Sequence, residues 1–243
     1  MFIKQTTVSW FSAGVSSAVA TWLVRDKVDK IIYTHIDDQH PDTMRFVKDC
    51  ERWFGKPVEI LQSPLKSVEN ACRQMAYING VRGAACTRLL KRRVRQEWES
   101  ANQWFNTFRY VWGMDSKEAK RADRLNDSMP QQEHLFPLCE KSISKEEAHG
   151  ILRQAGIKRP AMYDLGLHNN NCRVCVKGGK GYMNLCRRLF PDEFWARARL
   201  ERLIGASCIN GVYLDELDPE AGRHEEPIVE ECGAMCEIIK EQL

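Results

Sequence analysis

Apolar, β-rich runs alternate with amphipathic helical patterns up to about residue 115 of the chain. The β-rich runs lie at Thr7–Phe11, Ile31–His35, Val58–Leu61 and Phe108–Trp112. Between them, apolar residues recur with the spacing of one helix face, at 15–23 and again at 46–54, where Pro41 suits the helix start. Strand and helix in alternation predict an α/β fold, a doubly wound parallel sheet with helices on both faces.

The pattern changes after residue 140, which predicts two parts. We expect a nucleotide-binding α/β domain over 1–140 and a mostly helical C-terminal region over 141–243, with a Cys-rich loop and a mobile tail. Ser144 and Glu147 can form a capping box that opens a helix toward Gly156. A further helix is expected over 191–204, and a short helix is expected to close the chain.

Three polar loops follow strand candidates, so we expect them to meet at the carboxyl end of the sheet, where ligands of such folds bind. They read FSAGVSS (11–17), HIDDQHP (35–41) and WGMDSKE (112–118). In the first loop, small residues before a helix leave backbone N–H groups uncovered, which suits a phosphate. The candidate phosphate-binding residues are Ser12, Gly14, Ser16 and Ser17. The alternative is a plain turn with a helix cap.

Charge and cysteine content narrow the classes of function. The net charge of +3 is too small to argue for nucleic acid by itself, and no apolar run approaches the roughly 18 residues of a membrane span. The N-terminus lacks a signal-peptide layout, so we expect a cytoplasmic protein without a membrane partner. In that reducing compartment, ten cysteines favour metal or redox roles over disulfides. The oligomeric state stays open.

The pair Cys172-x-x-Cys175 has the spacing of two ligands to zinc or to an iron–sulfur cluster. It lies in a polar stretch, LGLHNNNCRVCVKGGKG, that is too rich in Asn and Gly for regular structure. A structural knuckle or a chance pair is the alternative.

The loop at 12–17 resembles the pyrophosphate loop of the adenine nucleotide α-hydrolase (PP-loop) superfamily, usually Ser-Gly-Gly-x-Asp-Ser. Here Ala13 is the second residue, and Ser16 stands where aspartate is usual. ATP-pyrophosphatase chemistry commonly keeps that acid, whereas phosphate binding does not need it. The stretch HIDDQHPDTMRF resembles the family segment in which a strand ends in aspartate, and Asp37 matches it.

Two further motifs are similar to those of phosphoadenylylsulfate (PAPS) and adenylylsulfate (APS) reductases. CTRLLKRRVR resembles their Cys-x-x-x-x-Lys segment and assigns Lys91. GMDSKEAKR resembles their Gly-x-x-x-x-Glu-x-x-Arg and assigns Gly113, Glu118 and Arg121. Taken together, the ordered motifs resemble the PAPS reductase-like family, in the versions common in phages and prophages.

That resemblance implies an enzyme that binds an adenine nucleotide (ATP, APS or PAPS) and reduces an adenylylsulfate-type sulfonucleotide with a thiol. AMP or adenosine 3′,5′-bisphosphate would be released. Lys91 and Arg121 would offset the charge of sulfate and phosphate. Glu231-Cys232-Gly233 resembles the setting of the catalytic cysteine near the C-terminus of the reductases, with Cys236 as a resolving thiol. A thioredoxin- or glutaredoxin-type protein would supply reducing thiols.

The resemblance also implies a metal group. Adenylylsulfate reductases hold a [4Fe-4S] cluster with Cys-Cys followed some 80–90 residues later by Cys-x-x-Cys. Cys86, Cys172 and Cys175 match three of these ligands, and residue 85 is alanine. Cys139, Cys232 or Cys236 could be the fourth, and zinc is the competing metal.

Other interpretations stay open. The same fold could use ATP to activate a nucleic acid or base and deliver sulfur, and the basic run from Arg88 to Arg95 could instead meet a nucleic-acid backbone. Glu118 and Arg121 could be a surface pair. A non-catalytic nucleotide-binding protein with a structural metal knuckle is the third alternative.

Overall fold

The computed structural model describes residues 4–103, 106–223 and 225–231. Cys232, Cys236 and the expected closing helix therefore lie outside the described residues. Among the helices that are described, none has the length and apolar character needed to cross a membrane.

A single five-stranded sheet organises the first half of the chain. Its strands are β1 (Lys4–Phe11), β2 (Lys30–His35), β3 (Val58–Gln62), β4 (Asn106–Val111) and β5 (Glu133–Leu135). Their order is β3-β2-β1-β4-β5, and every pairing is parallel. The predicted α/β class and the four predicted strands are confirmed. The three-residue β5 was not predicted.

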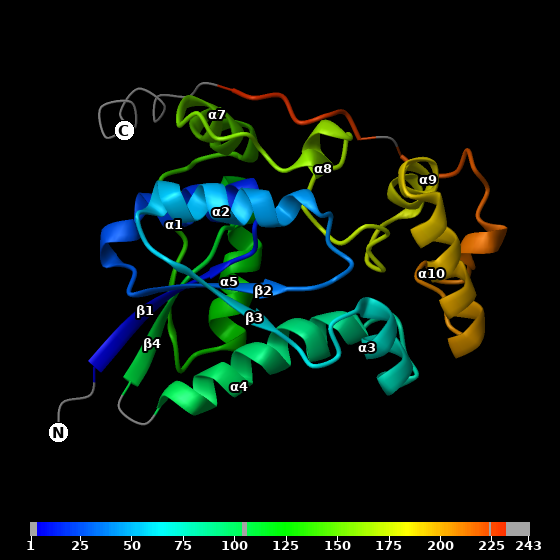
Figure 1. The fold of residues 1–243 in the computed structure, drawn as a ribbon, viewed down its shortest axis with the longest axis horizontal. Coiled ribbons are helices and arrows are strands. Elements are labelled where there is room, and N and C mark those ends of the chain that lie inside the picture. The colour runs from blue at the N-terminus through cyan, green and yellow to red at the C-terminus, as the bar shows by residue number, and fades with distance from the viewer. Residues whose placement is uncertain (1–3, 104–105, 224, 232–243) are drawn as a thin grey trace.

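Side chains that alternate along β2 bury both faces of the sheet. Ile31 and Tyr33 pack into the cluster with α1 (Val15–Leu23) and α2 (Asp42–Phe54). Ile32 points to the opposite cluster, which α4 (Arg93–Asn102) covers with Trp98. Figure 1 shows α1 and α2 on one side of the strands and α4 on the other. Period-two alternation of apolar residues buried on both faces is what a doubly wound parallel sheet requires.

The remaining elements complete the two helical layers and the C-terminal region. The α-helices are α3 (Val68–Met75), α5 (Ala119–Ser128), α6 (Pro137–Glu140), α7 (Lys145–Gln154), α8 (Ala161–Asp164), α9 (Lys180–Leu189) and α10 (Pro191–Ile204). The 3₁₀-helices are η1 (Arg25–Lys27), η4 (Ser116–Glu118) and η5 (Leu214–Glu216), and η2 (Thr87–Arg92) is a π-helix.

The two helices predicted over the described residues of the second half are present. The capping box forms at the start of α7, where the Ser144 hydroxyl accepts from Glu147 N at 3.1 Å and Glu147 Oε2 accepts from Ser144 N at 2.8 Å. Helix α10 begins at Pro191 and ends before Gly205, whose φ of 71° closes the helix in the left-handed region. Helix α7 packs against α1, in the same cluster as α2.

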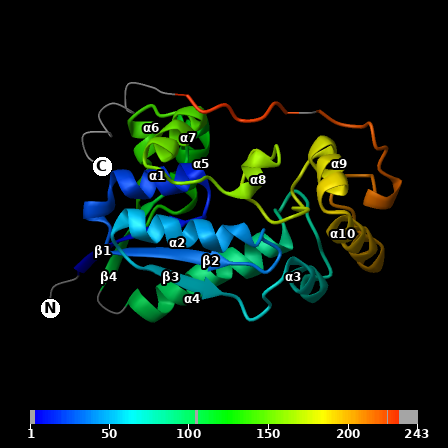
Figure 2. The ribbon, with the colours of Figure 1, turned by 45° about the horizontal axis from the view of Figure 1, so that its top comes forward.

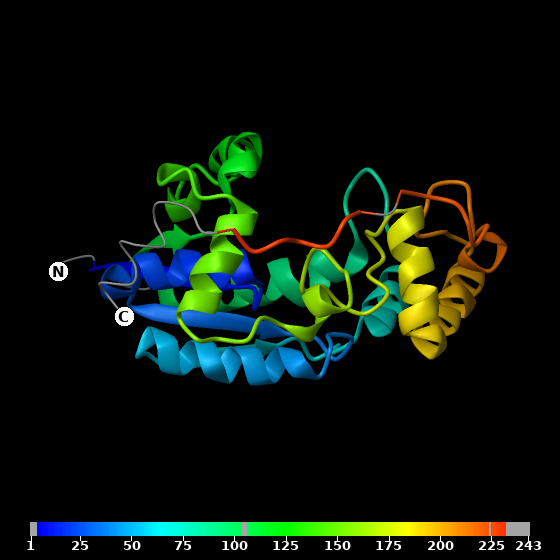
Figure 3. The ribbon, with the colours of Figure 1, turned by 90° about the horizontal axis from the view of Figure 1, so that it is seen from above.

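A second hydrophobic cluster lies beyond the carboxyl ends of the strands. There α9 and α10 pack against α3 and the chain around Ala84–Cys86. Figure 3 shows α9 and α10 at one end of the molecule. The guanidinium of Arg197 on α10, only 6% exposed as a residue, meets Asp38 at 2.8 Å and anchors this cluster to the loop after β2.

The last described segment, residues 217–223 and 225–231, is here called the C-terminal strap. It runs from beside α9 past α8 to α7 (Figures 1 and 2). Polar contacts hold its far end. The guanidinium of Arg159 donates to Ile228 O at 3.2 Å, and the Glu231 N–H donates to Glu146 O at 3.1 Å.

Candidate nucleotide and thiol site

The loop of residues 12–17, here called the phosphate loop, lies at the point where the strand order reverses. It follows β1, and β2 and β4 flank β1 on opposite sides. The loop after β4, which begins at Trp112, therefore ends beside it. Open parallel sheets bind ligands in the crevice at this switch point.

Hydrogen-bond donors of the phosphate loop converge on a single oxygen. The Ser17 hydroxyl oxygen accepts from Ser12 N at 3.2 Å and Gly14 N at 3.3 Å, and it lies 2.9 Å from the Ser12 hydroxyl. Ala13 turns the chain with a φ of 57°, in the left-handed region that favours glycine. Successive N–H groups aimed at one point form an oxygen-binding concavity, the geometry with which proteins hold anions.

Gly113 lets the loop after β4 touch the start of α1. A Cβ built on Gly113 would lie 2.3 Å from Ser17 Cα and 2.5 Å from Ser17 N. No side chain can occupy that space without moving one of the two backbones. The sequence motif singled out Gly113, and its physical role in this structure is close backbone approach at the switch point.

Two residues that the sequence did not single out support the phosphate loop. The Asn170 side-chain amide, buried and distant in the chain, donates to Ala13 O at 2.7 Å. The Tyr163 hydroxyl accepts from Val15 N at 3.2 Å. Both contacts span about 150 residues, so no local pattern could have revealed them. They join the Cys-rich segment to the phosphate loop.

The two aspartates of the loop after β2 make different contacts. Asp37 is exposed, and its carboxylate accepts from the Gln62 amide at 2.6 Å. Asp38 accepts from Val68 N at 2.7 Å at the start of α3 and pairs with Arg197. Asp37 is thus the one whose carboxylate faces solvent at the strand end, as a ligand-binding position requires.

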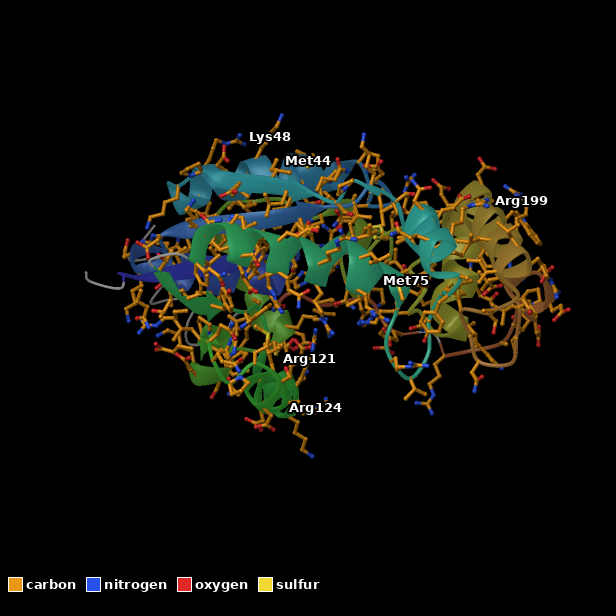
Figure 4. The ribbon with its side chains drawn as sticks, turned by 90° about the horizontal axis from the view of Figure 1, so that it is seen from below. Met44, Lys48, Met75, Arg121, Arg124 and Arg199 are labelled. Atoms are coloured by element: carbon orange, nitrogen blue, oxygen red, sulfur yellow. The ribbon has the colours of Figure 1, made fainter. Side chains whose placement is uncertain are left out.

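Glu118 and Arg121 lie on the loop after β4 and on α5. Glu118 Oε2 accepts from Asp115 N at 3.4 Å in a capping box, and Glu118 Oε1 pairs with Arg121 Nη1 at 2.5 Å. The Arg121 side chain is 63% exposed. Figure 4 shows it projecting from α5, away from α2, which carries Lys48. The structure records no contact between Arg121 and Lys91.

The structure brings Cys86, Cys172, Cys175 and Lys91 into one neighbourhood. Burial raises the pKa of Cys172 to about 12, Lys91 opposes the rise, and Cys175 and Cys86 add to it. Burial also raises the pKa of Cys86, again with a contribution from Cys175 and opposition from Lys91. These charge contributions link Cys86 and Cys172 to Cys175 and Lys91, although 86 residues separate Cys86 from Cys172. Their role as ligands stays a prediction.

A tight turn presents the Cys172-x-x-Cys175 pair, which we call the thiol turn. Val174 adopts a left-handed φ of 51° inside it. The Tyr182 hydroxyl closes it, donating to Cys172 O at 3.0 Å and accepting from Cys175 N at 3.1 Å. Cys172 also forms a β-bridge with Gln39, in the loop after β2. The thiol turn is therefore docked on the carboxyl end of the sheet.

The donor set does not yet fit a metal. Within the described residues, no three His, Cys, Asp or Glu side chains are arranged to hold a metal ion. Cys139, one candidate fourth ligand, lies elsewhere, with its thiol donating to Asp115 O at 3.1 Å and packed against the cluster after β4. The other two candidates, Cys232 and Cys236, lie beyond the last described residue. A cluster or zinc ion stays a prediction.

Comparison with known proteins adds no family. The chain matches no protein-family model, and a search of curated proteins finds no significant relative.

Proposed function

We propose that this protein is an adenine-nucleotide-binding enzyme that reduces an adenylylsulfate-type sulfonucleotide with a thiol. The observation that carries the proposal is the convergence of phosphate-loop donors on the Ser17 hydroxyl oxygen at the switch point of the sheet. The Ser17 hydroxyl itself donates to Gly14 O at 2.9 Å, so a phosphate oxygen would accept from the Ser12 and Gly14 N–H groups once that side chain turns away. The first turn of α1 adds N–H groups that no residue of the helix can accept.

Contacts around the phosphate loop support the location of the sulfate chemistry. Asn170 fixes the loop to the segment that leads into the thiol turn. Burial raises the pKa of Cys86 and Cys172, and the nearby charge of Lys91 offsets part of that rise. In the proposed complex, the Lys91 ammonium would offset the negative charge of the sulfate in the transition state.

The course of the C-terminal strap supports Cys232 as the attacking thiol. Its last described residue, Glu231, donates to Glu146 O, and its charge helps to raise the pKa of Lys117. The largest cause of that rise is the hydrogen bond from Lys117 to Glu146. Lys117 belongs to the loop after β4, so the chain reaches this side of the site one residue before Cys232.

The proposed reaction has two thiol steps. The Cys232 thiolate attacks the sulfate sulfur, the bond from sulfur to the phosphate oxygen breaks, and AMP or adenosine 3′,5′-bisphosphate leaves. Cys232 is left carrying a thiosulfonate. A second thiolate, from Cys236 or an external dithiol protein, attacks the Cys232 sulfur and expels sulfite. Oxidation of the two thiols to a disulfide supplies the two electrons that reduce sulfate to sulfite. A thioredoxin- or glutaredoxin-type dithiol then reduces the disulfide back to two thiols.

Nucleotide binding is tested first, without turnover. Gly113→Ala places a methyl group against Ser17, so we expect the Kd for AMP, measured by calorimetry, to rise at least about tenfold. Gly179→Ala is the matched control, because nothing lies within 4 Å of its added Cβ. Equal affinities for the two folded variants would contradict a phosphate site at the switch point.

Sulfite release from APS and PAPS with a dithiol then tests the reaction. We expect activity in the wild type, none in Cys232→Ser and a retained fold in that variant. Cys236→Ser, if Cys236 resolves the intermediate, should accumulate Cys232 with the added mass of one SO₃ group. Cys139→Ser is the control for removal of a thiol elsewhere. If the wild type binds nucleotide and releases no sulfite, the proposed reaction is contradicted and the alternative of a non-catalytic nucleotide-binding protein is favoured.

One observation favours a second candidate, ATP-dependent sulfur transfer to a nucleic acid or base. The charges of Cys175 and Lys91 affect both Cys86 and Cys172, and Asn170, two residues before Cys172, contacts the phosphate loop. That reaction would convert ATP to AMP and pyrophosphate in the presence of the acceptor. Ser16 in place of the usual aspartate argues against it. Pyrophosphate release without sulfite release would select this candidate.

A further inference from the structure

A cavity of about 690 Å³ lies outside the phosphate loop. Its walls are the chain between α8 and the thiol turn, the start of α9, and the C-terminal strap. Figure 3 shows the strap passing α8 on its way between α9 and α7. No residue of the phosphate loop or of the loop after β4 lines the cavity. It is therefore distinct from the crevice at the switch point.

The cavity lining carries an excess of positive charge. Lys177, Lys180 and Arg223 line it, and none of the three forms an ion pair with a described residue. The one lining carboxylate, Glu225, already has a partner, since its Oε2 lies 3.4 Å from His168 Nδ1. Three unpaired cations around one concave surface raise the local concentration of anions.

Close backbone contacts hold two of the walls together. A Cβ on Gly181 would lie 1.9 Å from Arg223 O, and one on Gly222 would lie 2.0 Å from Gly181 N. Both positions must be glycine for the strap to touch the first turn of α9. This contact fixes the backbone of Arg223 at the cavity wall.

Other lining residues supply a thiol and apolar groups. Cys175 lines the cavity, half-buried, with its N–H held by the Tyr182 hydroxyl. The Tyr182 ring fits because Gly178 has no side chain: a Cβ there would lie 2.1 Å from the ring. Leu165, Leu167 and Leu185 complete the apolar side. A volume of this size is typical of pockets for small molecules, and exceeds what an inorganic anion fills.

We propose that this cavity is a second binding site, for a small molecule with an apolar body and a phosphate, sulfate or sulfonate group. Lys177, Lys180 and Arg223 surround the anionic group, and Cys175 and Tyr182 contact the body. Tetrahedral oxyanions are the shared chemistry. The inference goes beyond the proposed reaction and does not rest on it.

Calorimetry on the full chain tests the site with three probes: inorganic phosphate, inorganic sulfate and phenyl phosphate. Each titration is run with and without saturating AMP, which on the proposed function occupies the phosphate loop. We expect phenyl phosphate to bind more tightly than either inorganic anion, because it also covers the apolar wall. In Lys177→Gln/Lys180→Gln/Arg223→Gln, its Kd should rise at least about tenfold, since three charge-assisted contacts are lost.

The matched control removes the same charge elsewhere. Lys48→Gln/Arg124→Gln/Arg199→Gln changes three exposed cations that do not line the cavity (Figure 4). It should bind phenyl phosphate as the wild type does, with equal urea midpoints for all three proteins. Three results would overturn the proposal: no binding by the wild type, equal weakening in both triple variants, or binding that AMP abolishes. The last would make the cavity part of the nucleotide site. Equal AMP affinities of Gly113→Ala and Gly179→Ala would instead contradict the proposed function and leave the proposal for this cavity unaffected.

Discussion

Acid should destabilise this protein through His149, a residue of α7 that is 1% exposed. Neither ring nitrogen has a hydrogen-bond partner among the described residues, and the ring packs edge-on against Tyr163 at 4.6 Å between centroids. Burial lowers the pKa of His149 to about 3, and the positive charges of Arg159 and Lys145 add to the effect. Glu146 and Asp164 oppose it weakly.

The sign and size follow from proton linkage. An unfolded histidine has a pKa of about 6.5. Between about pH 6.5 and 3, His149 is therefore protonated in the unfolded chain and neutral in the folded protein. Stability is therefore lost as the pH falls below about 6.5. Between pH 8 and pH 5 the loss from this one residue amounts to about 2 kcal/mol. The result is insensitive to the folded pKa, provided that it stays below about 4.

Urea unfolding at pH 8 and pH 5 measures the loss, and His149→Leu isolates it. The variant should lose about 2 kcal/mol less than the wild type over this interval. At pH 8 it should be no less stable, since it also removes two buried nitrogens without partners. Equal pH dependence in the wild type and His149→Leu would refute the reasoning.

Three further perturbations have defined outcomes. Arg197→Met leaves the Asp38 carboxylate without its counterion, so urea unfolding should show a loss of about 3–5 kcal/mol, part of which Asp38→Asn restores in the double variant. In metal analysis after anaerobic purification, iron with acid-labile sulfide, or zinc, that Cys172→Ser loses would support the predicted site with ligands beyond the described residues, and protein without either metal would contradict it. Gly181→Ala forces the facing strap carbonyl away, so limited proteolysis should cut the strap faster than in Gly179→Ala, whose added Cβ meets nothing.

Local patterns were sufficient for most of the fold. Pro191 begins α10 and Gly205 ends it, and the predicted range of 191–204 agrees with the structure. The strand β5 has three residues and was missed, because its pairing to β4 gives it strand geometry that so short a run cannot signal.

The site divides in the same way. Gly113 was assigned from the resemblance of its motif. The position of the phosphate loop could be predicted from small residues after a strand, because strand ends determine where such loops lie. Tyr163 and Asn170 could not, since their value comes from contacts with residues about 150 positions away. The thiol neighbourhood was anticipated from a resemblance in spacing, whereas the Tyr182 hydroxyl that closes the thiol turn carries no sequence signal.

The backbone contact between Gly113 and Ser17 has a thermodynamic consequence. With Asn170 and Tyr163 also attached, the phosphate loop is fixed before any ligand arrives. An incoming phosphate would need to turn the Ser17 side chain aside, and ordering one such side chain costs far less than ordering a loop. The association rate should then be set by diffusional encounter and not by a rearrangement of the loop. Differences in affinity between anions should come from their dissociation rates. Such a site would tell ligands apart by shape, because its walls have little room to adapt.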